Sequence, residues 1–310
     1  MIEPGEVQLP PLGPTDVLVS NRAIGVNFID VYLRSGLYPV PQLPMLLGVE
    51  GAGVVEGVGS DVESVSPGDR VAYAGPPIGS YAAARVLPQA RLIGIPDPVS
   101  FETAAAAMLR GLTAHMLLTR VRATAAGDWI LVHAGAGGLG QMLTRWAVGL
   151  GARVIATVGG PEKQALAQAA GADHVLLHGD PDLAVKVREI TGGLGVDAAY
   201  DGIGGDMLLR TLDCVRPFGL VASTGQAAGP IPNLPLEALG PRKALTLSRP
   251  SVMLYASDAD RYRAGGAELM ARLAEGLPVA IGARYPLAQA RDAHEALEQG
   301  RTTGSVILIP

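Results

Sequence analysis

The stretch WILVHAGAGGLGQMLTRWAVGLG, residues 129–151, decides the fold class of this chain. Its apolar start, 129–133, predicts a buried strand, and the periodic apolar residues of 139–151 predict an amphipathic helix. Between them lies a Gly-x-Gly-x-x-Gly pattern, whose glycines let the backbone turn sharply and approach a pyrophosphate at the helix N-terminus. In this strand–helix context the pattern predicts a dinucleotide site rather than a glycine-rich turn that binds nothing. Its positions are Gly135, Ala136, Gly137, Gly138, Leu139 and Gly140.

Downstream of this stretch, short apolar runs alternate with helical patterns. Strand and helix alternating at short intervals is typical of βαβ units, so the sequence predicts an α/β fold with a doubly wound parallel sheet. The expected strands are 153–158, 173–177, 196–201 and 219–224, and the expected helices are 161–171, 182–191 and 205–212.

The regions before and after this alternating segment have different sequence patterns. Residues 1–100 are rich in Gly and Pro, and their short β-type runs (17–20, 53–59 and 70–74) predict an irregular, mostly β domain. Residues 101–121 predict a helical region around a glycine break. After about 247 the alternation stops, and the pattern predicts helices at 262–276 and 287–299 and a closing strand at 305–309.

Size, charge and cysteine content narrow the class of protein. The 310 residues suggest about two domains at roughly 100–200 residues each, and 48% hydrophobic residues suffice for two cores. With 24 basic and 29 acidic residues, a net charge of −5 argues against nucleic acid or an anionic membrane as main partner. No secretion signal or membrane helix is expected. The single cysteine, Cys214, is expected to be a small buried hydrophobe and suits a reducing cytoplasm.

The end of the second strand of the predicted sheet indicates the cofactor. Proteins that bind NAD tend to place an acidic residue there, for the ribose 2′-OH. Here the strand ends in Thr157-Val158-Gly159-Gly160 without an acid, and Lys163 follows. Gly159 leaves room and Lys163 could supply a cation for a 2′-phosphate, so the sequence favours NADPH over NADH. The alternative is that Lys163 is an ordinary solvated helix residue.

Five segments along the chain together resemble the NADPH:quinone oxidoreductases, the zeta-crystallin-like branch of the zinc-free medium-chain dehydrogenases/reductases. The resemblance implies a Rossmann NADPH-binding domain (109–246) inserted into a GroES-like, mostly-β catalytic domain (1–108 and 247–310). The family's opening strand and its Gly-Gly-Pro-Glu turn are largely absent: either the start is assigned too late, or an edge hairpin is missing and apolar surface is exposed. The segments are GVNFIDVYLRSGLYP (25–39), LPMLLGVEGAGVVEGVGSDV (43–62), GDRVAYA (68–74), HAGAGGLG (133–140) and RTTGSVILIP (301–310).

Zinc is not expected. Zinc alcohol dehydrogenases of this superfamily carry a Gly-His-Glu motif whose histidine ligates the metal, whereas this chain has Gly48-Val49-Glu50. Valine cannot coordinate a metal, and one cysteine cannot build a four-cysteine site. The five histidines show no ligand spacing.

The resemblance also implies roles for single residues. Asn27, Tyr32 and Tyr38 match residues that line the nicotinamide and substrate cleft, and Tyr38 either positions the substrate, donates a proton or only packs the cleft. Asp30 lies in the same block but could simply hold the loop.

Further positions match the family's cofactor residues. Lys163 and Arg301 match basic residues for the 2′-phosphate, although Arg301 could be an exposed turn arginine. Thr113 resembles a position near the cofactor. His178 stands where an aromatic residue often holds the adenine or ribose, and Thr224 begins a Thr-Gly pair where the family has Phe-Gly near the nicotinamide.

The reaction that the resemblance implies is hydride transfer from NADPH to a quinone without a metal. Stacking of the quinone on the nicotinamide would make the step effectively unimolecular. Reduction of the activated C=C bond of an enone, alkenal or acyl thioester remains a second hypothesis, and a non-enzymatic, crystallin-like NADPH-binding or RNA-binding role is a third. A homodimer through the cofactor domain is expected, with the apolar, proline-rich segment 229–252 as either its contact or a surface linker.

Overall fold

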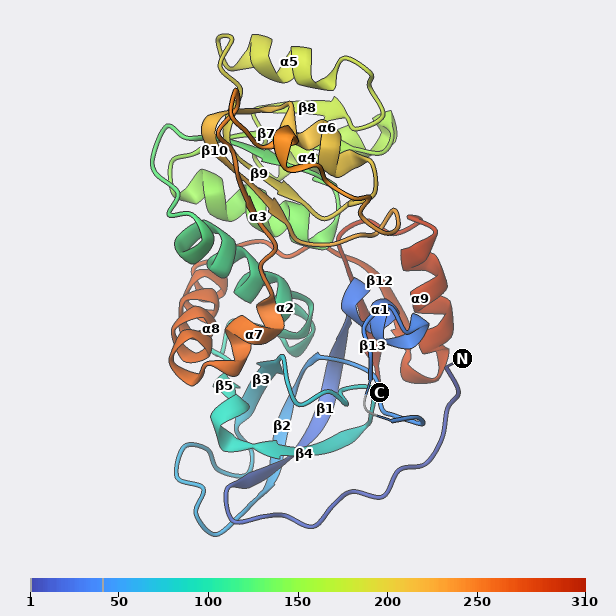
Figure 1. Ribbon diagram of the computed structural model, residues 1–310. Coiled ribbons are helices and arrows are strands. Elements are labelled where there is room, and N and C mark those ends of the chain that lie inside the picture. Colours follow the sequence, from blue (N-terminus) through green and yellow to red (C-terminus); the bar gives the residue numbers. More distant parts are fainter. Residues whose placement is uncertain (1, 41) are drawn as a thin grey trace. The chain divides into compact units, whose positions relative to one another are not determined.

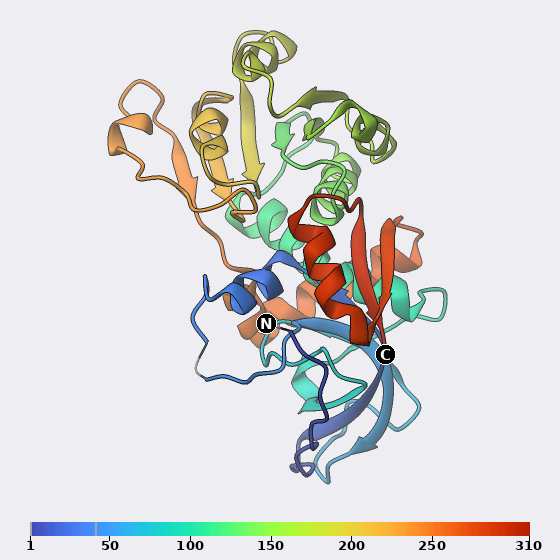
Figure 2. The same ribbon diagram turned by 90° about the vertical axis from the view of Figure 1, so that its right-hand side faces the viewer.

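The computed structural model describes residues 2–40 and 42–310, and the chain divides into two units. Unit 1 combines the residues up to Leu112 with Val252–Pro310, and unit 2 is Thr113–Ser251. The boundaries expected from the sequence, 108/109 and 246/247, lie four and five residues from those of the structure. Figures 1 and 2 show the elements of each unit.

Unit 1 is built on a seven-stranded, mostly antiparallel sheet. Its order is β12-β13-β1-β2-β3-β5, with β4 paired to β1. Strand β13 pairs antiparallel with β1, so the C-terminal segment joins the sheet made by the first hundred residues. The strands are β1 (Asp16–Val26), β2 (Glu50–Val58), β3 (Arg70–Ala74), β4 (Ala84–Pro88), β5 (Ile93–Gly94), β12 (Ile281–Pro286) and β13 (Ser305–Ile309).

Two small apolar clusters fill the sheet of unit 1. The inward residues of β1 alternate with partly buried ones in its first half, so Val17 and Val19 are fully buried against Val55 and Leu87. The other cluster joins β1 and β13 to α9. The helices are α1 (Phe28–Ser35), α2 (Phe101–His115, whose last three residues belong to unit 2), α7 (Val252–Ser257), α8 (Ala259–Ala274) and α9 (Ala290–Glu298), with 3-10 turns η1 (Gln89–Arg91) and η5 (Leu287–Gln289).

Helix α2 and the start of the chain each test an expectation from the sequence. The glycine break was wrong, because α2 runs unbroken through Gly111. A Cβ at Gly111 would lie 2.4 Å from Cδ1 of Leu269, so this glycine admits the neighbouring helix α8 instead of ending α2. Near the start of the chain, residues 2–13 lie in no helix or strand, and the side chains of Val7, Leu9 and Leu12 are exposed.

Unit 2 carries the predicted doubly wound sheet, which is confirmed. Its six strands are all parallel in the order β11-β10-β9-β6-β7-β8. The chain runs outward from β6 through β7 to β8, then returns to β9 on the other side of β6. The order therefore reverses between β6 and β9, where dinucleotides bind in such folds. The strands are β6 (Trp129–Val132), β7 (Arg153–Val158), β8 (His174–Leu177), β9 (Val196–Asp201), β10 (Val215–Ser223) and β11 (Thr246–Ser248).

Helices cover both faces of this sheet (Figure 2). Helices α3 and α4 pack together against β6, β7 and β8, whereas α6 packs with α5 and covers β9 and β10. The buried side of α5 and α6 supplies Leu183, Val187 and Leu212 to the core, and Cys214 is buried there as expected. The helices are α3 (Gly138–Gly149), α4 (Gln164–Ala169), α5 (Leu183–Ile190) and α6 (Met207–Leu212), with the π-helix η2 (Met116–Val121) and 3-10 turns η3 (Pro161–Lys163) and η4 (Leu236–Ala238).

Candidate functional site

The glycine loop between β6 and α3 has no space for side chains at two of its glycines. A Cβ at Gly140 would lie 2.3 Å from the carbonyl oxygen of Ala134 and 2.8 Å from Cα of Gly135. A Cβ at Gly135 would lie 2.7 Å from Cβ of Ala156 in β7. These contacts are with backbone or with a rigid methyl group, so the loop can pass this close to β7 only because the positions are glycine.

The loop delivers the N-terminus of α3 to the carboxyl edge of the sheet. Gly137 is the N-cap of α3 and makes no side-chain cap, and Gln141 donates instead to the carbonyl oxygen of Ala136 at 2.8 Å. The first amide groups of a helix have no intrahelical acceptor and carry the positive end of its dipole. The segment from Gly137 to Gly140 can therefore hold an anion such as a pyrophosphate.

A buried polar chain that the sequence did not reveal ties three strand ends together. His133, directly after β6, hydrogen-bonds through Nδ1 to the Thr157 hydroxyl (2.7 Å) and through Nε2 to the Thr211 hydroxyl (2.9 Å). Thr211 also donates to Oδ2 of Asp201 at 3.2 Å. Burial lowers the pKa of His133 to about 4, so the ring is neutral at physiological pH. These hydrogen bonds therefore hold the ends of the strands together while His133 stays uncharged.

Asp201 then orders the loop that follows β9. Its Oδ1 accepts from the amides of Ile203 (2.8 Å) and Gly204 (3.1 Å). Its backbone oxygen accepts from the amide of Thr224 (2.6 Å) and from the Thr224 hydroxyl (3.0 Å). Thr224 is thus held at the end of β10, beside the end of β9, at the edge of the sheet that carries the glycine loop.

Basic side chains gather where β7 ends. A Cβ at Gly159 would lie 3.3 Å from Cε1 of His178. Burial lowers the pKa of His178, and the charges of Arg210 and then Lys163 lower it further. Arg210 of α6 donates from Nη1 to the carbonyl oxygen of His178 at 2.8 Å. Three positions that the sequence assigned to the cofactor, Gly159, Lys163 and His178, therefore lie together. Arg210 is the member that the sequence did not single out.

The remaining two predicted cofactor residues lie elsewhere. Thr113 is buried in α2 as the first residue of unit 2. Arg301 belongs to unit 1, is exposed, and follows α9 with its amide donating to the carbonyl oxygen of Ala296 (3.1 Å).

In unit 1, Asn27 is the N-cap of α1 and is almost fully buried. Its amide donates to Oδ2 of Asp30 at 2.8 Å, and its side-chain Nδ2 donates to Oε1 of Glu50 at 2.7 Å. Glu50, fully buried at the start of β2, also accepts from Nη1 of Arg110 (3.1 Å) and from the amide of Leu109 (2.5 Å). Asn27 is thus held in orientation by Glu50, a member of a buried ion pair. The sequence had pointed to Glu50 only as part of the triplet that lacks the zinc ligand.

The two tyrosines singled out from the sequence lie against each other. The rings of Tyr32 and Tyr38 meet edge to face with centroids 5.2 Å apart, and the Tyr38 amide donates to the Tyr32 carbonyl oxygen at 3.0 Å. Tyr32 is buried, whereas Tyr38 is partly exposed. Tyr38 can therefore meet a small molecule, and Tyr32 supports it from behind.

Asp30 belongs to a second buried chain. Its Oδ2 accepts from the Tyr81 hydroxyl at 3.3 Å, and this hydroxyl also lies 2.9 Å from Nε2 of His294. Burial, reinforced by the charge of Glu50, raises the pKa of Asp30 to about 7. Burial likewise lowers the pKa of His294 to about 4. Asp30 caps α1, which agrees with a role in holding the loop.

Asp30 should make the protein less stable as pH rises. Because its carboxyl pKa is 3.8 unfolded and about 7 folded, the folded state binds the extra proton between these values, and stability falls across that window. The free energy of unfolding should therefore fall by up to about 1.4 kcal/mol per pH unit because of Asp30, and Asp30→Asn should remove this part of the slope. Urea unfolding of both proteins across the window measures it, and parallel pH profiles would contradict the assignment.

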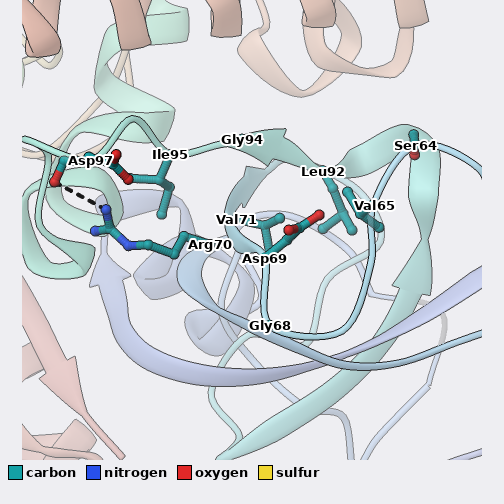
Figure 3. A pocket seen from close by; sticks show the side chains of 10 residues that line it. All are labelled: Ser64, Val65, Gly68, Asp69, Arg70, Val71, Leu92, Gly94, Ile95 and Asp97. Atoms are coloured by element: carbon teal, nitrogen blue, oxygen red, sulfur yellow. Dashed lines mark hydrogen bonds between the residues drawn. The ribbon is translucent and has the colours of Figure 1, made fainter.

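A surface hollow of about 480 Å³ in unit 1 is lined by none of these residues (Figure 3). The guanidinium of Arg70 donates there to the carbonyl oxygens of Pro96 and Asp97 (3.2 Å each) and stacks on Phe101 at 4.7 Å. Its cation is thus used within the protein. The lining residues are Ser64, Val65, Gly68, Asp69, Arg70, Val71, Leu92, Gly94, Ile95 and Asp97.

Comparison with known proteins assigns the chain to a family. The model of the alcohol dehydrogenase GroES-like domain matches residues 13–97, and that of the zinc-binding dehydrogenases matches 138–269. A quinone oxidoreductase of Pseudomonas aeruginosa is 44% identical over 299 residues, which cover 96% of this chain and 92% of the relative. The chain belongs to the quinone oxidoreductase family. The family resemblance and the fold predicted from the sequence are both confirmed.

Two further proteins similar to this chain bear on function. The 2-haloacrylate reductase of a Burkholderia species is 39% identical over 312 residues, covering 98% of this chain and 94% of the relative. The crystal structure of Escherichia coli quinone oxidoreductase complexed with NADPH matches with a TM-score of 0.95 at 39% identity, covering 99% of this chain and 95% of that one.

Two properties of the described residues complete the picture of this family member. Within 2–40 and 42–310, no three His, Cys, Asp or Glu side chains are grouped as metal ligands would be. In the same ranges, no helix is long and apolar enough to cross a membrane.

Proposed function

We propose that this protein is an NADPH-dependent quinone oxidoreductase. The observation that carries the proposal is the carboxyl edge of the unit 2 sheet, where a tight glycine loop lies beside the end of β7. This strand is followed by glycines at 159 and 160 instead of an acid, and Lys163, His178 and Arg210 lie close to its end. NAD-binding folds place at this strand end an acid that would repel a 2′-phosphate. Membership of the quinone oxidoreductase family supports the same conclusion.

The residues of unit 2 fit NADPH. Because Gly135 and Gly140 have no Cβ, the loop backbone can lie close to the sheet. The first amides of α3 would hold the pyrophosphate. Lys163 and His178 would hold the 2′-phosphate, and Arg301 and Thr113 are proposed to add contacts. NADPH, once bound, supplies the hydride from C4 of its nicotinamide.

The protein itself contributes binding and orientation. We assign unit 1 as the catalytic domain, with Asn27 and Tyr38 facing the substrate and Tyr32 packed behind Tyr38, and unit 2 as the cofactor domain. The Glu50–Arg110 pair holds the Asn27 amide in place, so Asn27 offers a fixed polar group. Quinones are good acceptors, so holding the quinone in position is the main demand on these residues.

Tyr38 is the proposed proton donor or positioning group. If its hydroxyl donates a proton, we expect Tyr38→Phe to lower kcat by about 100-fold, the usual size of a general-acid contribution. Steady-state kinetics with a quinone measures this, and Tyr285→Phe is the matched control because Tyr285 is a partly exposed tyrosine of β12 outside the candidate site. Unchanged kcat and KM in Tyr38→Phe would remove the proton-donor role.

The activity test uses two acceptors in parallel. NADPH oxidation would be followed by absorbance with an ortho-quinone and with a medium-chain 2-enal, and NADH serves as the cofactor control. We expect rapid turnover of the quinone with NADPH. Turnover of the enal alone would replace the proposal by the second candidate, a C=C double-bond reductase, which the 39% identity to a 2-haloacrylate reductase favours. Equal use of NADH would overturn the cofactor assignment.

Assembly and location complete the proposal. Strand β11 ends the sheet of unit 2, and the neighbouring side chains of Phe218 and Leu236 are 81% and 77% exposed. Burying such apolar groups favours association, so we propose a homodimer through this part of unit 2, in the cytoplasm. Light scattering of the purified protein tests the dimer, and a monomer at micromolar concentration would contradict it.

A further inference from the structure

The ring of His178 lies within a cluster of positive charge at the end of β7. We call Lys163, His178 and Arg210 the basic cluster. These residues come from three elements: the end of η3, the turn after β8, and α6. Arg210 is anchored, because Nη1 donates to the carbonyl oxygen of His178 and Nη2 donates to that of Asp180. The turn that carries His178 is therefore held in place by Arg210.

One buried nitrogen of the His178 ring, Nδ1, has no hydrogen-bond partner within residues 2–40 and 42–310. The other edge of the ring faces Gly159, where a Cβ would lie 4.0 Å from Nε2 and 3.3 Å from Cε1. A side chain at position 159 would thus press against the ring, and glycine leaves this face of His178 open at the strand end where dinucleotide folds read the ribose.

The charges around His178 disfavour its protonation. Burial is the main cause that lowers the pKa of the ring, and Arg210 and Lys163 lower it further. His133, in the buried chain behind it, is itself held neutral.

The nearby carboxylates do not compensate for these positive charges. The carboxylate of Asp180 is bound by Lys186, and that of Glu162 folds over Gly160, where a Cβ would lie 2.3 Å from its Oε2. Neither acts on the pKa of His178. The ring is therefore neutral at pH 7 and lacks an anion that would stabilise its charged form.

We propose that His178 is a proton-dependent specificity residue, which binds the ribose 2′-phosphate as an imidazolium and takes up a proton from solvent when the cofactor binds. The inference rests on the proposed use of NADPH. The phosphate brings roughly two negative charges to the basic cluster. An imidazolium donates from both ring nitrogens, so its hydrogen bond to the phosphate is charge-assisted.

Linkage fixes the direction of the effect. The phosphate favours the charged ring, so the pKa of His178 is higher with cofactor bound than without it. Affinity for the 2′-phosphorylated cofactor therefore rises as pH falls through the bound-state pKa, and it levels off below the free-state pKa. The cofactor without the 2′-phosphate lacks this dependence.

Binding of NADP⁺ and NAD⁺ to the intact protein and to His178→Gln tests the proposal. The oxidised cofactors are stable in acid, and glutamine keeps a polar side chain of similar length that does not titrate. We expect the variant to bind NADP⁺ within about threefold of the wild type near pH 8 and about tenfold or more weaker near pH 5.5, the size of one charge-assisted hydrogen bond. The ratio for NAD⁺ should stay constant.

Titration calorimetry in buffers of different ionisation enthalpy provides a second readout. The wild type should take up more protons per NADP⁺ than His178→Gln, whereas the titration of the phosphate itself is common to both. Equal proton uptake, or parallel pH profiles, would overturn the role of His178 while leaving the cofactor assignment intact as long as NADP⁺ binds tighter than NAD⁺. Equal affinity for both cofactors at every pH would overturn the cofactor assignment as well.

Discussion

Gly140→Ala is expected to weaken NADPH binding by about 100-fold, equivalent to about 2.7 kcal/mol. The new methyl carbon would lie 2.3 Å from the Ala134 carbonyl oxygen, and backbone cannot swing aside as a flexible side chain can. Overpacking of this kind costs about 1–3 kcal/mol, and the displaced loop would also lose amide contacts to the pyrophosphate.

The measurement is the dissociation constant of NADPH by calorimetry, with near-ultraviolet circular dichroism to check the fold. Gly94→Ala is the matched control, because a Cβ at this glycine of β5 meets nothing within 4 Å. A folded Gly140→Ala that binds NADPH normally would show that the pyrophosphate does not bind at this loop.

Arg110→Met is expected to destabilise unit 1 by about 3–5 kcal/mol near neutral pH, because it leaves the Glu50 carboxylate buried without its cation. The Glu50 side chain is fully buried and that of Arg110 is 9% exposed, so water cannot replace the lost partner. The variant also removes the donor to the Val26 carbonyl oxygen, which Arg110 reaches through Nη2 at 2.8 Å. The loss should shrink at lower pH, because burial raises the pKa of Glu50 and its protonation removes the orphaned charge.

Two probes localise the effect of Arg110→Met. Both tryptophans, Trp129 and Trp146, belong to unit 2, so urea unfolding followed by fluorescence reports on that unit, while circular dichroism reports on both. In Arg110→Met, we expect part of the circular dichroism signal to be lost at lower urea concentration than in the wild type, without an equal shift of the fluorescence transition. The double variant Glu50→Gln/Arg110→Met should be more stable than Arg110→Met, since no buried charge remains. Unfolding within about 1 kcal/mol of the wild type would contradict a structural ion pair.

The ion pair also links stability to the candidate site. Glu50 holds Nδ2 of Asn27, so loss of Arg110 leaves Asn27 bound to a carboxylate that has lost its cation. The double variant replaces this carboxylate with a neutral amide whose oxygen can still accept from Asn27, so it is expected to restore part of any lost kcat along with the stability. This separates the positioning of Asn27 from general unfolding.

Local patterns predicted most of unit 2. The strand at 129–132 and the helix at 138–149 differ by one or two residues from the expected 129–133 and 139–151, because apolar periodicity and the glycine run mark both ends. The cofactor assignment also came from a local feature, the lack of an acid after Val158. Such features depend on neighbours along the chain, which the sequence displays directly.

The glycine at 111 shows where this reasoning fails. A glycine inside a helical pattern is a sound local sign of a break. Gly111 is instead required by Leu269, which is far away in the sequence and packs on α2 from α8. Only the tertiary contact explains the residue.

The sequence by itself determined the parallel sheet, the glycine loop and the absence of an acid at the strand end, because each is a property of consecutive residues. The tertiary structure decided which polar groups meet. The Arg110–Glu50 pair joins residues 60 positions apart, His133 and Thr211 are 78 apart, and Arg210 and His178 are 32 apart. No periodicity connects such residues, and their partners are fixed only when the packing of strands and helices removes water from both.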